Sequence, residues 1–261
     1  MPDTFLGKAL GFIADNKDHP FFMFYATHEN HVPRIPHPRF RGSTSLGVRG
    51  DAVVQMDWGI GRIMETLEEL GLTENTLIIF SSDNGPVLFD GYYDGAWEMN
   101  GDHKPAGPWH GGKYSSWEGG TRMPTIISWP GTVEPGLSDA IVSQVDLIAS
   151  LASLTGATLP SGRASDSQNQ IHAFLGHTDV GRDHVVQQGV ASKSIRVGDW
   201  KYQPPGQVRD RRRIGTNHYE PIPETGGLYF LPEDPAERNN LAARYPKKAA
   251  QLAALLAQEL Q

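Results

Sequence analysis

Two adjoining segments in the first third of the chain constrain the fold more than any other feature. From Asp51 to Leu70, apolar side chains recur three and four residues apart, which is the periodicity of an α-helix. Gly71 follows and is expected to end that helix. The next apolar run, Thr76 to Phe80, is short and is typical of a buried strand. A helix followed at once by a buried strand predicts an α/β fold.

The rest of the chain continues this alternation. The near-continuous apolar run Phe21–Ala26 suits a parallel strand covered on both faces. Around residues 158–166 the chain becomes rich in Pro, Gly and Ser, which predicts a subdomain boundary. We therefore expect a mostly parallel sheet flanked by helices in residues 1–158, and a small α+β subdomain in residues 159–261. The further expected elements are helices over 4–17, 138–154 and 247–260, and strands at "TIISWPG", "SIRVGDWKY" and "GGLYFL".

Composition excludes several classes of protein. The net charge of -7 makes the chain a poor candidate for binding nucleic acid. No apolar run reaches the ~18 residues that a membrane helix needs. Cysteine is absent, so disulfides, thiolate metal sites and a cysteine nucleophile are excluded for this chain. The N-terminal residues lack the pattern of a signal peptide, and localisation stays open.

Polar side chains follow the two apolar runs at the point where each predicted strand ends. Asp83 and Asn84 follow the second run, and His28 and His31 follow the first. Ligands bind outside the carboxyl ends of parallel strands, so these four side chains converge if the strands share one sheet. Asp and Asn oxygens suit a hard cation such as Ca²⁺ or Mg²⁺. Asp-Asn-Gly is also a common turn sequence, so a metal site and a plain turn are both open.

A glycine-rich loop, "GPWHGGKYSSWEGG", carries a lysine. The spacing of Gly107, Gly112 and Lys113 approaches that of a nucleotide-binding P-loop. Tyr114 replaces the Ser or Thr that would bind Mg²⁺, and no strand precedes Gly107, so we reject that function. Lys113 is either an anion-binding group, held where glycines let backbone come close, or a solvated loop lysine.

Two further clusters are not expected to form sites. The stretch "HENH" does not match the zinc motif H-E-x-x-H, and Pro33 argues against a helix there. An arginine run, broken by Asp210, is expected to be a solvated loop, with contact to an anionic glycan as the alternative. The run consists of Arg209, Arg211, Arg212 and Arg213.

Several segments together resemble the sulfatase family of the alkaline-phosphatase-like superfamily. They are "FFMFYATHENHVPRIPHPRF", "GDAVVQMDWGIGRIMETLEELGLTENTLIIFSSDNGPV", "GGKYSSWEGGTRMPTIISWPG", "SDAIVSQVDLIASLASLTG" and, near the end, "GLYFLPEDPAERNNLA". Their order and spacing are similar to those in the second half of a sulfatase. The resemblance implies the fold of that family, with its N-terminal part missing, and hydrolysis of sulfate esters.

The resemblance also implies roles for individual residues. Asp83 and Asn84 match the pair that ligates the active-site calcium. Lys113 matches the lysine that contacts the sulfate, and His31, in His-x-Pro, matches the histidine that bonds to the sulfate ester. These two are the expected catalytic residues. Expected substrate-binding residues are His28, which is offset by one position from the family pattern, and His103 and His110, which lie in the same long loop as Lys113.

The chain departs from the family pattern at the nucleophile. Sulfatases use a formylglycine made from the Cys or Ser of C/S-x-P-x-R, and this sequence has no such motif. Two oxygen ligands are also too few for Ca²⁺, which takes roughly six to eight. We therefore expect the chain to be inactive alone, and to need a missing N-terminal half or a second copy as partner.

Three functions are consistent with the sequence. The first is the C-terminal part of a calcium-dependent sulfatase that acts on a sulfated carbohydrate or an aryl sulfate. The second is a phosphatase or phosphonate hydrolase of the same superfamily. The third is an inactive remnant that keeps only an anion-binding surface. Members of the family are often periplasmic or secreted, and this chain by itself gives no localisation.

Overall fold

The computed structural model describes residues 2–210 and 218–261. The first part of the chain forms α1 (Pro2–Asp15), η1 (Pro38–Phe40), α2 (Gly47–Glu69), η2 (Thr73–Asn75), β1 (Ile78–Ser81), η3 (Glu98–Asn100), α3 (Glu118–Thr121), β2 (Thr125–Ser128) and α4 (Asp146–Thr155). The second forms α5 (Ile171–Phe174), β3 (His184–Gln188), β4 (Lys193–Val197), β5 (Trp200–Gln203), β6 (Gly206–Asp210), β7 (His218–Ile222), β8 (Gly227–Phe230) and α6 (Pro246–Glu259). Within these described residues, none of the helices has both the length and the apolarity to span a membrane.

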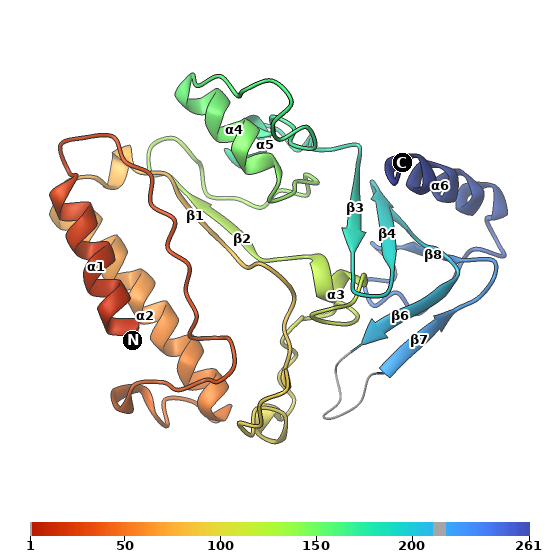
Figure 1. Cartoon of the computed structure of the whole chain (residues 1–261), viewed down its shortest axis with the longest axis horizontal. Helices are drawn as coiled ribbons and strands as arrows, with labels where there is room; N and C mark the ends of the chain where they lie inside the picture. The colour runs from red at the N-terminus through yellow and green to blue at the C-terminus, as the bar shows by residue number, and fades with distance from the viewer. Residues whose placement is uncertain (1, 211–217) are drawn as a thin grey trace.

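The N-terminal part consists of a helix pair beside a short two-stranded ladder. α1 and α2 lie side by side, and β1 and β2 run through the middle of the molecule (Figure 1). Leu6, Ala9 and Ile13 form the buried face of α1, as its apolar periodicity predicts. The predicted helices at 4–17 and 51–70 are therefore confirmed, with ends shifted by a few residues.

The expected parallel pairing of residues 21–26 with residues 76–80 is not made. Residues 21–26 form no strand, and β1 instead pairs antiparallel with β2, with Ile78 opposite Ser128. All five ladders among the described residues are antiparallel. A strand needs a hydrogen-bonded neighbour, and the described chain supplies none to this segment, which consequently stays extended and unpaired.

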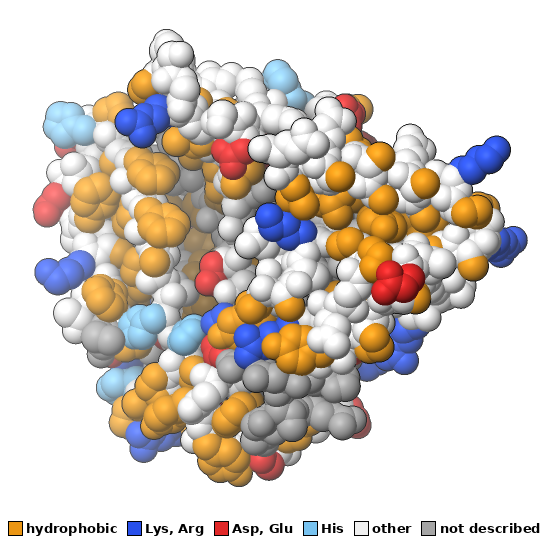
Figure 2. Space-filling view, turned by 45° about the vertical axis from the view of Figure 1, so that its right-hand side comes forward, with side chains coloured by type: hydrophobic (Ala, Val, Ile, Leu, Met, Phe, Trp, Pro, Cys, Tyr) orange, Lys and Arg blue, Asp and Glu red, His pale blue; other side chains and the backbone are white. Residues whose placement is uncertain are grey.

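The side chains of residues 21–26 keep the alternation of an extended strand. Phe22 and Phe24 are 75% and 83% exposed, whereas Phe21, Met23 and Tyr25 are half-buried. One face of the molecule is hollowed near its middle, with hydrophobic side chains gathered on the wall at the left (Figure 2). Exposed aromatic side chains in an extended segment indicate a surface that is apolar enough to be covered by other protein.

The C-terminal part is built on an antiparallel sheet in the order β3-β4-β5-β8. α6 packs against this sheet and buries Leu252 and Leu256 against Ile195 and Leu228. Beside it, β6 and β7 form a separate antiparallel hairpin (Figure 1). The strands predicted at "SIRVGDWKY" and "GGLYFL", and the final helix, are present. The division of the chain at residue 158 stays a prediction.

The arginine run was predicted to be a loop and is partly a strand. Arg209 lies in β6, and its guanidinium carbon lies 5.5 Å from the centre of the Tyr114 ring. Arg211, Arg212 and Arg213 lie outside the described residues. β6 was missed because its sequence, "GQVRD", is polar, and a two-stranded hairpin has too little apolar alternation to be recognised.

Candidate functional site

Close backbone contacts at glycines join the end of β1 to residues 107–120, the glycine-rich loop that carries Lys113 and is called the lysine loop here. The backbone N–H of Gly85 donates to the carbonyl of Gly120 at 3.0 Å, and that of Lys113 donates to the carbonyl of Pro86 at 3.0 Å. A Cβ at Gly85 would lie 2.0 Å from the carbonyl oxygen of Gly119, and one at Gly112 would lie 2.5 Å from that of Pro86. Only glycine fits these places, so the sequence brings "DNGP" and "GGK" together through backbone contact.

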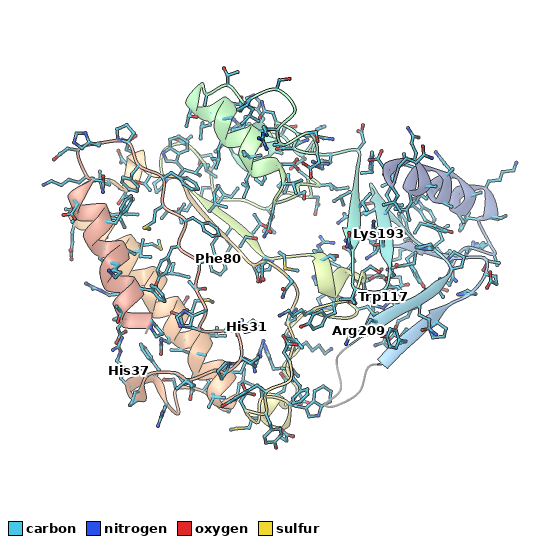
Figure 3. The ribbon with its side chains drawn as sticks, viewed as in Figure 1. His31, His37, Phe80, Trp117, Lys193 and Arg209 are labelled. Carbon is cyan, nitrogen blue, oxygen red and sulfur yellow. The ribbon has the colours of Figure 1, made fainter. Side chains whose placement is uncertain are left out.

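His31 and Lys113 meet although they are far apart in the sequence. Lys113 Nζ lies 3.3 Å from His31 Nε2. His31 extends from the segment after residues 21–26 toward the loop that follows β1 (Figure 3). His31 Nδ1 lies 2.7 Å from the carbonyl oxygen of Val32 and can donate to it, and Nε2 is the ring nitrogen that faces Lys113. The two sequence-predicted catalytic side chains therefore share one site.

Asp90 is the third member of this cluster, and sequence reasoning missed it. Its Oδ2 accepts a hydrogen bond from Lys113 Nζ at 2.9 Å, and its Oδ1 accepts one from the Tyr114 hydroxyl at 2.7 Å. Lys113 and Asp90 are largely buried, whereas the His31 side chain is 60% exposed. The only sequence signal for Asp90 is an acidic residue in the loop after β1, and many solvated loops have that feature.

The backbone at Tyr114 is strained in a way that serves this contact. Tyr114 has a φ of 80°, in the left-handed region that non-glycine residues rarely adopt. This turn places its hydroxyl on Asp90 while Lys113, the preceding residue, reaches the same carboxylate. Strain of this kind persists where surrounding contacts hold it, and it is often found at functional sites.

Arg34 fixes the loop that carries His31. Its side chain is almost fully buried, and its Nη1 donates to Asp94 Oδ2 at 2.8 Å. The same guanidinium donates to the carbonyls of Asn30 at 3.0 Å and Val87 at 2.8 Å. One buried cation thus ties the His31 loop to the loop that holds Asp90.

A buried charge network anchors the other end of the lysine loop to the C-terminal sheet. Lys201 Nζ on β5 lies 3.1 Å from Glu118 Oε1 and 3.0 Å from Glu237 Oε1. Burial opposes ionisation of Glu118, but the Lys201 ammonium, the Gln187 amide and the Arg196 guanidinium outweigh it and lower the pKa of Glu118 to about 2. Burial raises the pKa of Glu237, opposed by Lys201 and assisted by repulsion from Glu118.

The three other predicted histidines lie in different surroundings. The His28 ring packs edge-on against Phe5 at 5.6 Å. His110 Nε2 lies 2.6 Å from Glu220 Oε2 on β7, and its ring contacts Trp117 edge-on at 4.8 Å. His103 is exposed and lies at a cavity. The substrate-binding role of these histidines stays a prediction.

That cavity, of about 250 Å³, adjoins Lys113. It lies between the chain that leaves β1 and the lysine loop. Its wall is mostly apolar and includes two indole rings. The lining residues include Pro86, Leu88, Trp97, His103, Lys104, Trp109 and Lys113.

Asp83 and Asn84, the two residues predicted to hold a hard cation, lie just after β1. Asp83 is exposed at the end of β1, next to the glycine contacts that hold Lys113. Asn84 Nδ2 donates to the Gly85 carbonyl at 3.0 Å, and this orientation turns Oδ1 the other way. Two hard oxygens suit Ca²⁺, but they fall short of the roughly six to eight that it takes. Within residues 2–210 and 218–261, no cluster of three or more His, Cys, Asp or Glu side chains could hold a metal.

The sequence is similar to known sulfatases along nearly its whole length. Residues 2–157 match the Sulfatase family. An N-acetylgalactosamine-6-O-sulfatase from Bacteroides thetaiotaomicron is 44% identical over 262 residues, which cover 98% of this chain and 50% of that protein. A human N-acetylgalactosamine-6-sulfatase is 34% identical over 203 residues, or 77% of this chain and 37% of that protein. The chain spans half or less of the length of these relatives.

Solved structures also match nearly the whole of this chain and about half of their own length. A structure from a study of the metabolism of multiple glycosaminoglycans by Bacteroides thetaiotaomicron matches with a TM-score of 0.91 at 43% identity, over 98% of this chain and 54% of that one. A sulfatase from Pseudoalteromonas sp. matches with a TM-score of 0.82 at 26% identity, over 98% and 51%. The alkaline-phosphatase-like fold predicted from sequence is thereby confirmed. On the family match, the identities and the shared fold, this chain belongs to the sulfatase family and corresponds to the C-terminal half of its members.

Proposed function

We propose that the chain is the sulfate-recognising part of a sulfuric ester hydrolase that acts on a sulfated carbohydrate. The observation that carries the proposal is the pairing of Lys113 with His31 at 3.3 Å, at a place where the histidine is open to solvent. An ammonium beside an imidazole is suited to a small oxyanion. The relatives that act on 6-sulfated N-acetylgalactosamine, by their names, support a sulfated hexosamine as substrate.

In this proposal Lys113 and His31 bind the sulfuryl oxygens. The contact of the Lys113 ammonium with Asp90 weakens when the ester binds. The ammonium then neutralises the negative charge that develops on the sulfate oxygens as the ester bond breaks. Arg34 keeps His31 at its distance from Lys113, so the two groups are in place before the ester arrives. The exposed His31 edge is where the ester enters.

Calcium is the cofactor that we infer, and Asp83 and Asn84 are the residues of this chain that would hold it. When bound, calcium supplies positive charge that offsets the charge on the sulfate oxygens. The remaining ligands and the nucleophile would come from polypeptide outside this sequence, which has neither C/S-x-P-x-R nor cysteine. The share of the relatives' length that the chain covers supports this division.

A second candidate is a surface that binds sulfate without hydrolysing it. The Lys113–His31 contact favours it, because both partners lie within this chain. The two candidates share Lys113 and His31, and they differ in whether the missing polypeptide half restores turnover.

The test is turnover in the presence of that half. The chain would be produced together with the part of the Bacteroides thetaiotaomicron enzyme that it does not match, and sulfate release from 6-sulfated N-acetylgalactosamine would be measured with Ca²⁺ present. We expect hydrolysis by the pair and none by this chain alone. Lys113→Ala and Asp83→Ala should each slow it by about a hundredfold or more. Lys8→Ala on the exposed face of α1 is the matched control and should leave the rate unchanged.

Two results would overturn the proposal. One is hydrolysis of an aryl sulfate by this chain alone. The other is a full rate for the pair that carries Lys113→Ala. A pair that binds sulfate through Lys113 without turnover would support the second candidate.

A further inference from the structure

Arg49, in the first turn of α2, is a buried cation without a partner. The residue is only 7% exposed. Among residues 2–210 and 218–261, no oxygen accepts a hydrogen bond from its guanidinium and no carboxylate forms an ion pair with it. Buried charges in proteins are normally paired, because their removal from water is costly. An unpaired buried guanidinium therefore points to a ligand that supplies the missing negative charge.

The groups around Arg49 leave its charge uncompensated. Asp94 attracts it but already accepts a hydrogen bond from Arg34 at 2.8 Å, and Arg34 repels it. Burial lowers the pKa of Arg49, and repulsion from Arg34 lowers it further, against the opposing effect of Asp94. Arg34 and Asp94 balance each other, so the three side chains together carry one excess positive charge.

The N-terminus of α2 adds backbone donors. In the described part of the chain, the N–H groups of Gly47, Val48 and Arg49 donate to no acceptor, and no side chain caps the helix. Because α2 is 23 residues long, this end carries the partial positive charge of a full helix dipole. Helical side chains lean toward the N-terminus, so the Arg49 guanidinium extends in the direction of these free N–H groups.

Gly47 gives this end of the helix a shape that suits an anion. Its φ is 62°, in the left-handed region, and it follows Leu46 with φ −88° and ψ 14°. Successive residues of these two kinds turn their N–H groups to one side, as in an anion-binding nest. The Thr44 hydroxyl accepts from the Leu46 N–H at 3.2 Å, which leaves the N–H groups of Gly47 and Val48. A Cβ at Gly47 would lie 2.5 Å from Met99 Sδ, so η3 lies directly over this turn.

The excess charge and the limited access together define the class of ligand. A single negative charge balances the excess positive charge beside Arg49, whereas inorganic sulfate, a dianion, would leave a buried negative charge in its place. A carboxylate is planar and accepts two parallel N–H bonds from a guanidinium, and its remaining lone pairs can accept from backbone N–H groups. With 93% of Arg49 covered, only a small group can reach it.

We propose that the N-terminus of α2 is a binding site for a small carboxylate, with the Arg49 guanidinium and the N–H groups of Gly47 and Val48 as its donors. This site is distinct from the Lys113–His31 site, and the inference does not depend on the proposed function.

Calorimetric titration and thermal unfolding of the intact chain, with sodium acetate replacing sodium chloride at constant ionic strength, test the inference. The wild type should bind acetate, and its melting temperature should rise by a few degrees. Arg49→Met should weaken acetate binding by about tenfold or more and abolish this rise. Arg41→Met, at an exposed arginine before α2, removes the same charge and is the control, which should behave as the wild type.

The stability of Arg49→Met in chloride alone separates a ligand site from a structural role. Because this change removes an unpaired buried charge and keeps a long apolar side chain, the variant should be at least as stable as the wild type without acetate. Arg49→Lys is the second variant, which keeps the charge, loses the planar fork and should weaken acetate binding several-fold. An Arg49→Met variant that melts below the wild type in both solutions would overturn the inference. So would equal acetate affinities in the wild type, Arg49→Lys and Arg49→Met.

Lys113→Ala shows whether acetate binds at the other site instead. We expect this variant to bind acetate as the wild type does, since Lys113 is not among the proposed donors. Loss of acetate binding in Lys113→Ala, with binding retained in Arg49→Met, would place acetate at Lys113 and overturn the site at α2.

Discussion

Lys113 Nζ lies 2.9 Å from Asp90 Oδ2, so the lysine proposed to receive sulfate already has a carboxylate partner. An incoming anion therefore competes with Asp90 for the ammonium. His31 Nε2, 3.9 Å from the same carboxylate oxygen, faces this competition as well. The contact with Asp90 therefore holds Lys113 in place, but it also weakens the attraction of the Lys113 ammonium for an anionic ligand.

Removing the carboxylate should strengthen anion binding. We expect Asp90→Asn to bind inorganic sulfate about three- to tenfold more tightly, because the amide does not offset the charge of Lys113. Calorimetry at low ionic strength measures this. Asp57→Asn, an exposed position on α2, makes the same change in net charge and is the control. Equal affinities for the two variants would show that Asp90 does not restrain Lys113.

Arg34 should stabilise the protein far more than a surface arginine does. Arg34→Gln leaves Asp94 buried without its partner and should lower the free energy of unfolding by about 3–5 kcal/mol. Urea denaturation measures this. The comparison is Asp3→Asn, which breaks the exposed pair with Arg39 and should cost at most about 1 kcal/mol. Similar losses at the two places would contradict the role assigned to Arg34.

The glycine contacts at the end of β1 predict opposite results for two identical substitutions. Gly85→Ala forces a methyl group to 2.0 Å from the Gly119 carbonyl, so it should destabilise the protein and weaken sulfate binding. Gly61→Ala adds a methyl group where no atom lies within 4 Å, inside α2, and should stabilise it by about 0.5–1 kcal/mol. The melting temperatures of both variants test this prediction. A Gly85→Ala variant as stable as the wild type would contradict the close backbone contact at Gly85.

Glu118 predicts how stability depends on acidity. Its pKa is lowered to about 2 from an ordinary value of 4.5, so its contribution is complete above pH 4.5 and is lost as the pH falls through about 2. At pH 7, Glu118→Gln should cost about 3 kcal/mol, and the difference from wild type should shrink between pH 4.5 and pH 2. Burial gives Glu237 the opposite shift, so Glu237→Gln should cost less at pH 7. A cost for Glu118→Gln that does not vary with pH would contradict this account.

The sequence predicted elements and residues whose signals are local. Apolar periodicity predicted α1, α2 and α6, and the family motifs singled out His31 and Lys113, which lie 3.3 Å apart. The prediction of a buried strand at residues 21–26 was wrong. An apolar run indicates burial against neighbouring strands, but it does not tell whether those strands belong to this chain. Sequence reasoning also missed Asp90 and Arg34, since their roles depend on contacts with residues distant in the sequence.

The most direct test of the central claim is the affinity of the chain for sulfate with and without the Lys113 ammonium. Titration of sodium sulfate into the wild type and Lys113→Ala, with Lys8→Ala as the control on α1, gives this affinity. We predict binding by the wild type and by Lys8→Ala, and a loss of about tenfold or more in Lys113→Ala. Equal affinities in all three would contradict the account.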